Sequence, residues 1–230
     1  MKQPFAPWTN KIKILLGLGA AGAVAYIATI LNFGFSPEAV AVGYKPKQPV
    51  PFSHALHSGE LGMDCRYCHQ TVEYAKHSAV PSTETCMACH TRIHTESPKL
   101  EPVRQSWESE KPVAWVRIHD LADYAYFDHS AHVQKGVGCT SCHGRVDKME
   151  EVYQHERLSM GWCLDCHRNP QPHLRPKHLV TKMDWEPADN AAMAKSGSKL
   201  MSAAAAASDS YHSNTVEDVN PPQSCGACHR

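Results

Sequence analysis

Five copies of one short motif contain every cysteine of this chain. Each copy has two cysteines three residues apart and a histidine directly after the second cysteine. The copies are CRYCH at 65–69, CMACH at 86–90, CTSCH at 139–143, CLDCH at 163–167 and CGACH at 225–229. Thiols and imidazoles at this spacing could bind zinc, form disulfides, act as a redox dithiol or attach a cofactor covalently.

The histidine at the end of every copy helps to decide which of these chemistries applies. A disulfide framework has no use for it, and zinc would be satisfied by four ligands per ion without a histidine after each cysteine pair. A redox dithiol is normally single and lies in a βαβ unit. C-x-x-C-H, in contrast, is the attachment signature of c-type haem. Its two thiolates form thioethers with the haem vinyl groups, and its histidine binds the iron.

The sequence therefore predicts five covalently bound haem c groups. The predicted attachment residues are Cys65, Cys68, Cys86, Cys89, Cys139, Cys142, Cys163, Cys166, Cys225 and Cys228. The predicted proximal iron ligands are His69, His90, His143, His167 and His229.

Two further pairs of histidines are predicted to bind irons from the opposite, distal side. His54 and His57 precede the first motif, and His129 and His132 precede the third, each pair in the pattern Phe-x-His-x-x-His. Residues three apart share one face of a helical turn. Because two such side chains cannot comfortably reach one iron, each pair should serve two different haems. We expect His54 to bind the iron of the first motif and His57 that of another.

The fifth distal ligand is predicted from the remaining candidates. Met149 follows the third motif closely, and it is the preferred ligand; His77 and Met160 are kept in reserve. A methionine ligand would raise the reduction potential of its haem relative to haems with two histidine ligands. The alternative for a methionine is ordinary packing.

The histidine pairs also mark an internal repeat. Residues 52–69 and 127–144 both run from Phe-x-His-x-x-His to C-x-x-C-H, and a second motif follows each copy. With so few large apolar side chains, the haems themselves must fill the core. The expected fold is a multihaem cytochrome c with mostly short helices and irregular loops around stacked haems. The expected units are a first two-haem unit (52–110), a second (111–175), an extended arm (176–220) and a fifth haem site (221–230).

An uncharged stretch of 22 residues, 14–35, is long enough to cross a hydrocarbon core of about 30 Å as a transmembrane helix. Lysines occur before it in residues 1–13, which places this N-terminus in the cytoplasm. Residues 36–51 are Pro-rich and are expected to form an extended tether. A cleaved signal peptide is the alternative, but its apolar region would be only about 7–15 residues long.

The repeated blocks resemble the class III multihaem cytochromes. The longer strings GMDCRYCH, WVRIHDLADYAYFDHSAHVQKGVGCTSCHGRVDKM and LSMGWCLDCHRNP are similar to those of the pentahaem cytochrome c subunit of alternative complex III. Met149 and Met160 match methionines of the family strings. The resemblance implies an electron-transfer subunit of a quinol-oxidising respiratory complex, not an enzyme by itself. It also implies a single-pass protein of the bacterial inner membrane with its haem domain on the periplasmic side.

The resemblance further implies partners. These are an integral-membrane quinol-binding subunit of the polysulfide-reductase type, an iron–sulfur/molybdopterin-like subunit and a monohaem cytochrome. Electrons would pass to a soluble cytochrome or a terminal oxidase. The 23 basic and 23 acidic side chains balance, which gives no reason to expect nucleic acid as a partner.

Three other functions stay open at this point. The chain could serve another membrane quinol or molybdoenzyme system. It could be a multihaem reductase with one open iron, although such enzymes often have C-x-x-C-K in place of one motif, and no C-x-x-C-K occurs here. It could also be a quinol dehydrogenase in its own right. The Pro-rich residues 36–51 between the predicted helix and the first ligand favour a separate quinol-binding subunit.

Overall fold

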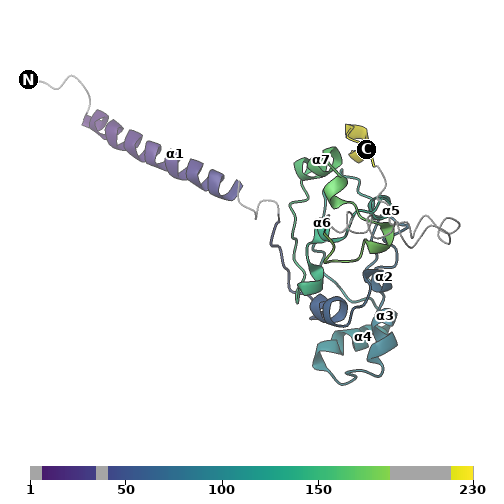
Figure 1. Ribbon diagram of the computed structural model, residues 1–230. Coiled ribbons are helices and arrows are strands. Elements are labelled where there is room, and N and C mark those ends of the chain that lie inside the picture. The colour runs from purple at the N-terminus through teal and green to yellow at the C-terminus, as the bar shows by residue number, and fades with distance from the viewer. Residues whose placement is uncertain (1–6, 35–40, 187–218, 230) are drawn as a thin grey trace, which may run out of the picture.

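The computed structural model describes residues 7–34, 41–186 and 219–229. One long helix, α1 (Ile12–Gly34), precedes a body of short helices joined by irregular segments (Figure 1). The helices of the body are α2 (Cys65–Cys68), α3 (Thr83–His90), α4 (Glu101–Ser109), α5 (His129–Gln134), α6 (Thr140–His143), α7 (Met160–Arg168) and α9 (Cys225–Cys228). The 3-10 and π-helical turns are η1 (Pro7–Lys11), η3 (Ala55–Glu60), η4 (Pro98–Leu100), η5 (Val146–Lys148), η6 (Gln171–His173) and η7 (Lys177–Leu179).

The only β-pairing in the described ranges is one isolated bridge, between Val137 and Leu174. Short helices and irregular loops therefore dominate the body, as the sequence predicted.

Polar residues before several helices explain why these short helices begin where they do. The side chain of Asp64 accepts a hydrogen bond from the backbone N–H of Arg66 at the start of α2. Ser159 does the same for Trp162 at the start of α7. A side-chain oxygen at this position satisfies an N–H group that has no partner within the helix. Residues close before these two motifs thus determine where the motif helices begin.

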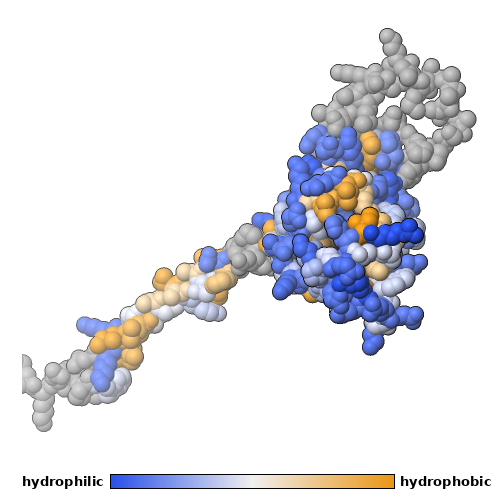
Figure 2. Space-filling view, turned by 90° about the horizontal axis from the view of Figure 1, so that it is seen from below, coloured by the Kyte–Doolittle hydropathy of each residue, from blue (hydrophilic) through white to orange (hydrophobic). Residues whose placement is uncertain are grey.

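Helix α1 differs from the rest of the molecule in its surface. Its 23 residues span about 34 Å at 1.5 Å per residue, and none of them is buried against the body. Figure 2 shows hydrophobic residues along α1, whereas most of the body surface in that view is hydrophilic. By length and composition α1 can cross a membrane, a property that it shares with signal sequences.

The Pro-rich segment after α1 is extended, and the body holds it in place. The backbones of Gly43 and Tyr44 exchange hydrogen bonds with Gln154, with N···O distances of 2.8 and 3.0 Å. The amide side chain of Gln48 pairs with both the N–H and the C=O of Val116, at 2.9 Å each. Residues 43–50 are therefore an ordered strap across the body rather than a free linker.

The buried apolar core is small. Among the described residues it consists of Val50, Val103, Met149, Leu174, Val180 and Trp185. Half of these residues lie in one segment, 174–185, which crosses the start of the third motif. The backbone of Arg175 donates to Gly136 O, and the backbone of Cys139 donates to Val180 O. Gly136 has φ = +82°, and a Cβ at this position would lie 2.3 Å from Arg175 O, so only glycine allows the two backbones to approach this closely.

This crossing differs from the expectation that residues 176–220 form an extended arm. Residues 176–186 pack into the body, because backbone hydrogen bonds to a glycine-containing turn hold them there. Proline, lysine and histidine in the sequence of this segment gave no sign of these partners. Residues 187–218 of the expected arm lie outside the described residues.

We predict that Leu174→Ala destabilises the protein, because this side chain is 0% exposed at the crossing. Removing a fully buried leucine side chain costs about 2–5 kcal/mol of unfolding free energy. Denaturant unfolding followed by far-ultraviolet circular dichroism measures this change. Leu61→Ala is the matched control, since Leu61 is 64% exposed. Equal loss of stability in the two variants would contradict the assignment of this core.

Candidate functional site

Each of the five motifs forms one turn of helix. The two cysteines of each motif lie in or at the start of α2, α3, α6, α7 and α9, and the histidine follows at or just after the end of that turn. Cysteines three residues apart in a helical turn lie on the same side of it. Both sulfurs of a motif can therefore reach one flat group, as covalent attachment of haem requires.

Backbone carbonyl groups orient the ring nitrogens of four of the five motif histidines. His69 Nδ1 lies 2.9 Å from Ala79 O, and His90 Nδ1 lies 3.0 Å from Ile93 O. Two more contacts of this kind are His167 Nδ1 with Pro222 O at 2.7 Å and His229 Nδ1 with Tyr124 O at 3.0 Å. A carbonyl oxygen only accepts hydrogen bonds, so Nδ1 carries the proton and Nε2 keeps a free lone pair for a metal.

Three of the four paired histidines upstream of the motifs show the same arrangement. His57 Nδ1 lies 2.9 Å from Ser53 O, His129 Nδ1 lies 3.0 Å from Lys76 O, and His132 Nδ1 lies 2.7 Å from Asp128 O. Seven histidines thus present Nε2 as an electron-pair donor. This hydrogen bond to the second ring nitrogen is typical of histidines that bind metals.

The upstream histidines face motif histidines at a distance that suits a metal ion between them. The ring centroids of His57 and His90 are 6.3 Å apart, those of His132 and His167 are 6.1 Å apart, and those of His129 and His143 are 6.4 Å apart. Two imidazoles that bind one metal ion from opposite sides through bonds of about 2.0 Å have ring centres about 6 Å apart. The spacing of all three pairs fits iron with two axial histidine ligands.

The phenylalanine of each repeat holds both histidines that follow it. The Phe52 ring stacks on His57, with ring centroids 4.4 Å apart, and meets His54 edge-on at 4.8 Å. The Phe127 ring stacks on His132 at 4.5 Å and meets His129 edge-on at 4.8 Å. The two copies of the repeat thus have the same local geometry, and within each copy the two imidazoles occupy different positions on one phenylalanine ring.

His54 and His143 are held in their neutral form. Burial, followed by the neighbouring His69 and His57, lowers the pKa of His54 to about 4. Burial, followed by nearby imidazoles, lowers the pKa of His143 to about 3. Both side chains are therefore neutral at pH 7, and neutral imidazole is the form that binds a metal.

The structure also brings His119 to the third motif, which the sequence did not predict. Its ring centroid lies 4.5 Å from that of His143, which is too close for a metal ion to bind between the two rings. His119 Nε2 is buried without a hydrogen-bond partner, and burial lowers the pKa of this side chain. His119 occurs singly in the sequence, without the Phe-x-His-x-x-His pattern, so only the tertiary contact identifies it.

The three candidates for the fifth distal ligand lie in different places. Met149 is 6% exposed and lines a cavity of about 570 Å³ beside Gly144, which directly follows the third motif. Met160 is 66% exposed and begins α7, which carries the fourth motif. His77 is exposed in the loop between the first and second motifs.

The cysteines of successive sites are neighbours in the first half of the molecule. Burial raises the pKa of the Cys68 thiol, and the neighbouring Cys86 and Cys65 thiols raise it further. The Cys65 and Cys139 thiols also act on each other, an interaction that lowers the pKa of Cys65 and raises that of Cys139. The first motif therefore lies between the second and the third.

Cysteines of successive motifs are also neighbours in the second half of the molecule. Burial raises the pKa of the Cys142 thiol to about 12, with further contributions from Cys166 and Cys163. Burial also raises the pKa of the Cys163 thiol, and the nearby Cys228 thiol adds to this effect. In space the motifs thus follow the order second, first, third, fourth and fifth. In Figure 1, α3 lies near one end of the body, and α7 and α9 lie at the other.

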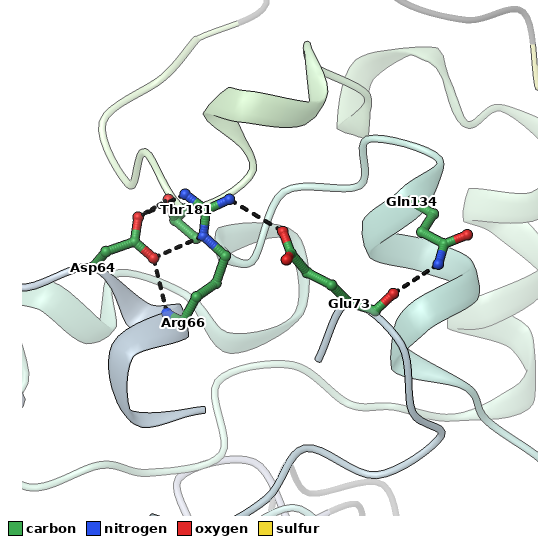
Figure 3. A network of polar contacts seen from close by, with 5 residues as sticks. All are labelled: Asp64, Arg66, Glu73, Gln134 and Thr181. Carbon is green, nitrogen blue, oxygen red and sulfur yellow. Dashed lines mark hydrogen bonds and ion pairs between the residues drawn. The ribbon is translucent and has the colours of Figure 1, made fainter. Parts of the chain in front are cut away.

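A polar network ties the first motif to the rest of the body (Figure 3). Arg66, inside the motif, binds the Asp64 carboxylate twice at 2.9 Å and the Glu73 carboxylate at 3.1 Å. Thr181 donates to Asp64 at 2.9 Å, and Gln134 donates to the backbone carbonyl of Glu73 at 2.7 Å. The Arg66 hydrogen bond is the main cause that lowers the pKa of Asp64. The network connects α2 with α5 and with the 174–185 segment.

Among the described residues, no group of three or more His, Cys, Asp and Glu side chains could hold a metal ion. Opposed pairs of imidazoles beside cysteine pairs instead suit haem, whose macrocycle supplies the other four iron ligands. The fold and this donor set define a multihaem c-type cytochrome, with covalently attached haem c.

Comparisons with known proteins agree with this class. The model of the Class III cytochrome C family matches residues 35–114, which include the first two motifs. The chain is also similar to the protein named "Menaquinone reductase, multiheme cytochrome c subunit" of Nitratidesulfovibrio vulgaris strain Hildenborough. The two are 27% identical over 172 residues, and the alignment covers 66% of this chain and 82% of the relative.

We predict that His132→Ala changes the spin state of one haem iron. The imidazole opposite His167 would be lost, and an iron with a single strong axial ligand becomes high-spin. Electron paramagnetic resonance and carbon monoxide binding to the reduced protein measure this change. His94→Asn is the control, because His94 is exposed and asparagine tolerates its φ of +54°. An unchanged low-spin spectrum in the His132 variant would refute the assignment.

Proposed function

We propose that this chain is a membrane-anchored pentahaem c-type cytochrome. It would be the electron-transfer subunit of a quinol-oxidising respiratory complex of the alternative complex III type. Helix α1 would be the uncleaved anchor in the bacterial inner membrane, and the haem domain would lie on the periplasmic side. Haem c, when bound, accepts and donates one electron per iron.

One observation carries this proposal: the five motifs form a continuous series through neighbouring cysteines. Cys86 neighbours Cys68, Cys65 neighbours Cys139, and the fourth motif is linked to the third and the fifth in the same way. Such a series allows electrons to pass between two partners, with the second and fifth motifs as its two ends.

The axial ligands that we propose follow the opposed imidazole pairs. His54 would serve the first motif, His57 the second, His129 the third and His132 the fourth. Three of these pairings are supported by ring separations of 6.1–6.4 Å. His54 is supported by its proximity to His69. With four irons given two histidines each, a reductase with an open iron has only one site left for its chemistry.

The relative's name supports a partner in the membrane that reacts with a quinone. That relative is a subunit of a menaquinone reductase, so the second candidate function is electron delivery to a quinone pool instead of electron withdrawal from it. The proposed partners are an integral-membrane quinol-binding subunit, an iron–sulfur/molybdopterin-like subunit and a monohaem cytochrome. A soluble cytochrome or terminal oxidase would be the acceptor.

Purification from native membranes tests the proposal and the direction of electron flow. We expect the chain to co-purify with an integral-membrane quinol-binding subunit, identified by mass spectrometry. Quinol should then reduce the haems of the complex, as the visible α-band shows. The isolated chain is the control and should not be reduced at a comparable rate.

Three other outcomes would support a different function. Oxidation of pre-reduced haems by added menaquinone, without reduction by quinol, would favour the second candidate. Rapid reduction of the isolated chain by quinol would show that it is a quinol dehydrogenase itself. Recovery without any quinol-binding membrane subunit would overturn the assignment to such a complex.

We propose Met149 as the remaining distal ligand. It lines the cavity beside the third motif, so it would bind that iron in competition with His129, and we predict the effect of replacing it. Met149→Leu keeps a similar apolar volume, but it removes the thioether, so one midpoint potential should fall or one iron should become high-spin. Potentiometric titration of the haem spectra measures both effects. Met160→Leu is the matched variant at the reserve position. If that variant alone produced the change, Met160 would replace Met149 in the assignment.

A further inference from the structure

Arg175 is a buried cation at the crossing of the 174–185 segment over the third motif. It is 4% exposed. Its guanidinium donates from Nη1 to Lys182 O at 2.8 Å and from Nη2 to Thr140 Oγ1 at 3.0 Å. The guanidinium carbon lies over the Trp185 ring, 4.5 Å from its centroid. All of these contacts are with neutral groups.

Other arginines of the body differ from Arg175 in their partners. Ion pairs join Arg66 to Asp64, Arg104 to Glu101, Arg117 to Asp120, Arg145 to Asp147 and Arg168 to Asp165. For Arg175, the described residues show neutral hydrogen-bond partners and a Nε that is buried without a partner. Burial lowers the pKa of Arg175, and the nearby Cys139 and the Glu186 carboxylate offset this only in part. A buried charge without a paired countercharge is costly, so a functional reason is worth seeking.

The position of this charge is set by a glycine. A Cβ on Gly138 would lie 2.0 Å from the guanidinium carbon of Arg175, so the cation occupies the space that any larger residue would need. Gly138 directly precedes Cys139, and Thr140 directly follows it. The guanidinium therefore lies against the backbone of the third motif at its first attachment cysteine. Its charge also acts on the Cys139 sulfur.

The first motif meets the third at the same place. Thr181, in the same segment as Arg175, donates to Asp64 at 2.9 Å, and Asp64 directly precedes Cys65. The Cys65 and Cys139 thiols also act on each other's pKa. Both would be thioether sulfurs in the haem-loaded protein. Arg175 thus lies at the junction of the two copies of the repeat, where the series of motifs passes from the first copy to the second.

We propose that Arg175 is an electrostatic positioning residue that raises the midpoint potentials of the haems at the first and third motifs. The inference rests on the proposed five-haem cytochrome. Reduction adds one electron to a ferric iron, and a fixed positive charge nearby favours the state that has gained the electron. Arginine stays protonated at any working pH, so this charge is permanent. A buried site also weakens screening by solvent and salt, which lets one charge act on both haems.

Potentiometric titration of the purified full-length cytochrome, with all five haems resolved, tests this inference. Arg175→Gln removes the charge and keeps a side chain that donates hydrogen bonds. We expect two of the five midpoint potentials to become more negative, with the other three unchanged. Arg175→Lys keeps the charge and should restore both potentials. A purely structural role would not separate glutamine from lysine in this way.

Two further variants complete the design. Arg168→Gln is the matched control, because Arg168 is exposed next to the fourth motif and solvent screens its charge. It should leave all five potentials unchanged. Thr140→Asp places a carboxylate on Nη2 and neutralises Arg175 without removing it. This variant should lower the same two potentials, and it keeps the test valid if Arg175→Gln does not fold.

Failure of the inference and failure of the proposed function give different results. Five titrating haems whose potentials are the same in the wild type, Arg175→Gln and Thr140→Asp would overturn the role of Arg175 alone. A protein with fewer covalent haems, counted by intact mass, would overturn the five-haem proposal. Equal shifts of all five potentials would indicate a general structural change and would also count against the inference.

Discussion

A hydrogen bond from an imidazole N–H to a backbone carbonyl recurs throughout this molecule, and the other features of the sites depend on it. It fixes which ring nitrogen keeps its lone pair, and it fixes the direction in which that nitrogen points. His57, His132 and His167 are held this way, and their rings then oppose their counterparts at separations that leave room for iron. Since the apolar core is small, these oriented pairs and the groups that they would bind take over much of the role of a core.

The sequence was informative where the chemistry is local. C-x-x-C-H lies within one helical turn, and Phe-x-His-x-x-His places both imidazoles on one phenylalanine ring, so five to six neighbouring residues determine each unit. The pairing of His57 with a motif other than the first also follows from this spacing, and the observed contact with His90 agrees with it. The full set of distal ligands stays a prediction.

Features built from distant segments were not predictable in the same way. An extended arm was expected to begin at residue 176, yet Val180 and Trp185 belong to the buried core. The position of the 174–185 segment depends on Gly136 and Gly138, about 40 residues earlier. Because glycine has no side chain, the Arg175 backbone can lie against Gly136 and the Arg175 guanidinium against Gly138. His119 is a similar case, because nothing in its own neighbourhood in the sequence distinguishes it from a surface histidine.

The contacts of the last described segment have a consequence for how the protein is made. His167 of the fourth motif is oriented by the carbonyl of Pro222, 55 residues later, and Tyr126 donates to the carbonyl of Cys228. The chain emerges from synthesis N-terminus first, so His167 is oriented only after Pro222 has been made. The orientation of the fourth motif's histidine therefore depends on residues that are synthesised well after the motif itself. A variant without residues 219–229 would lose the fifth motif and would also leave His167 of the fourth motif without the carbonyl that orients its ring.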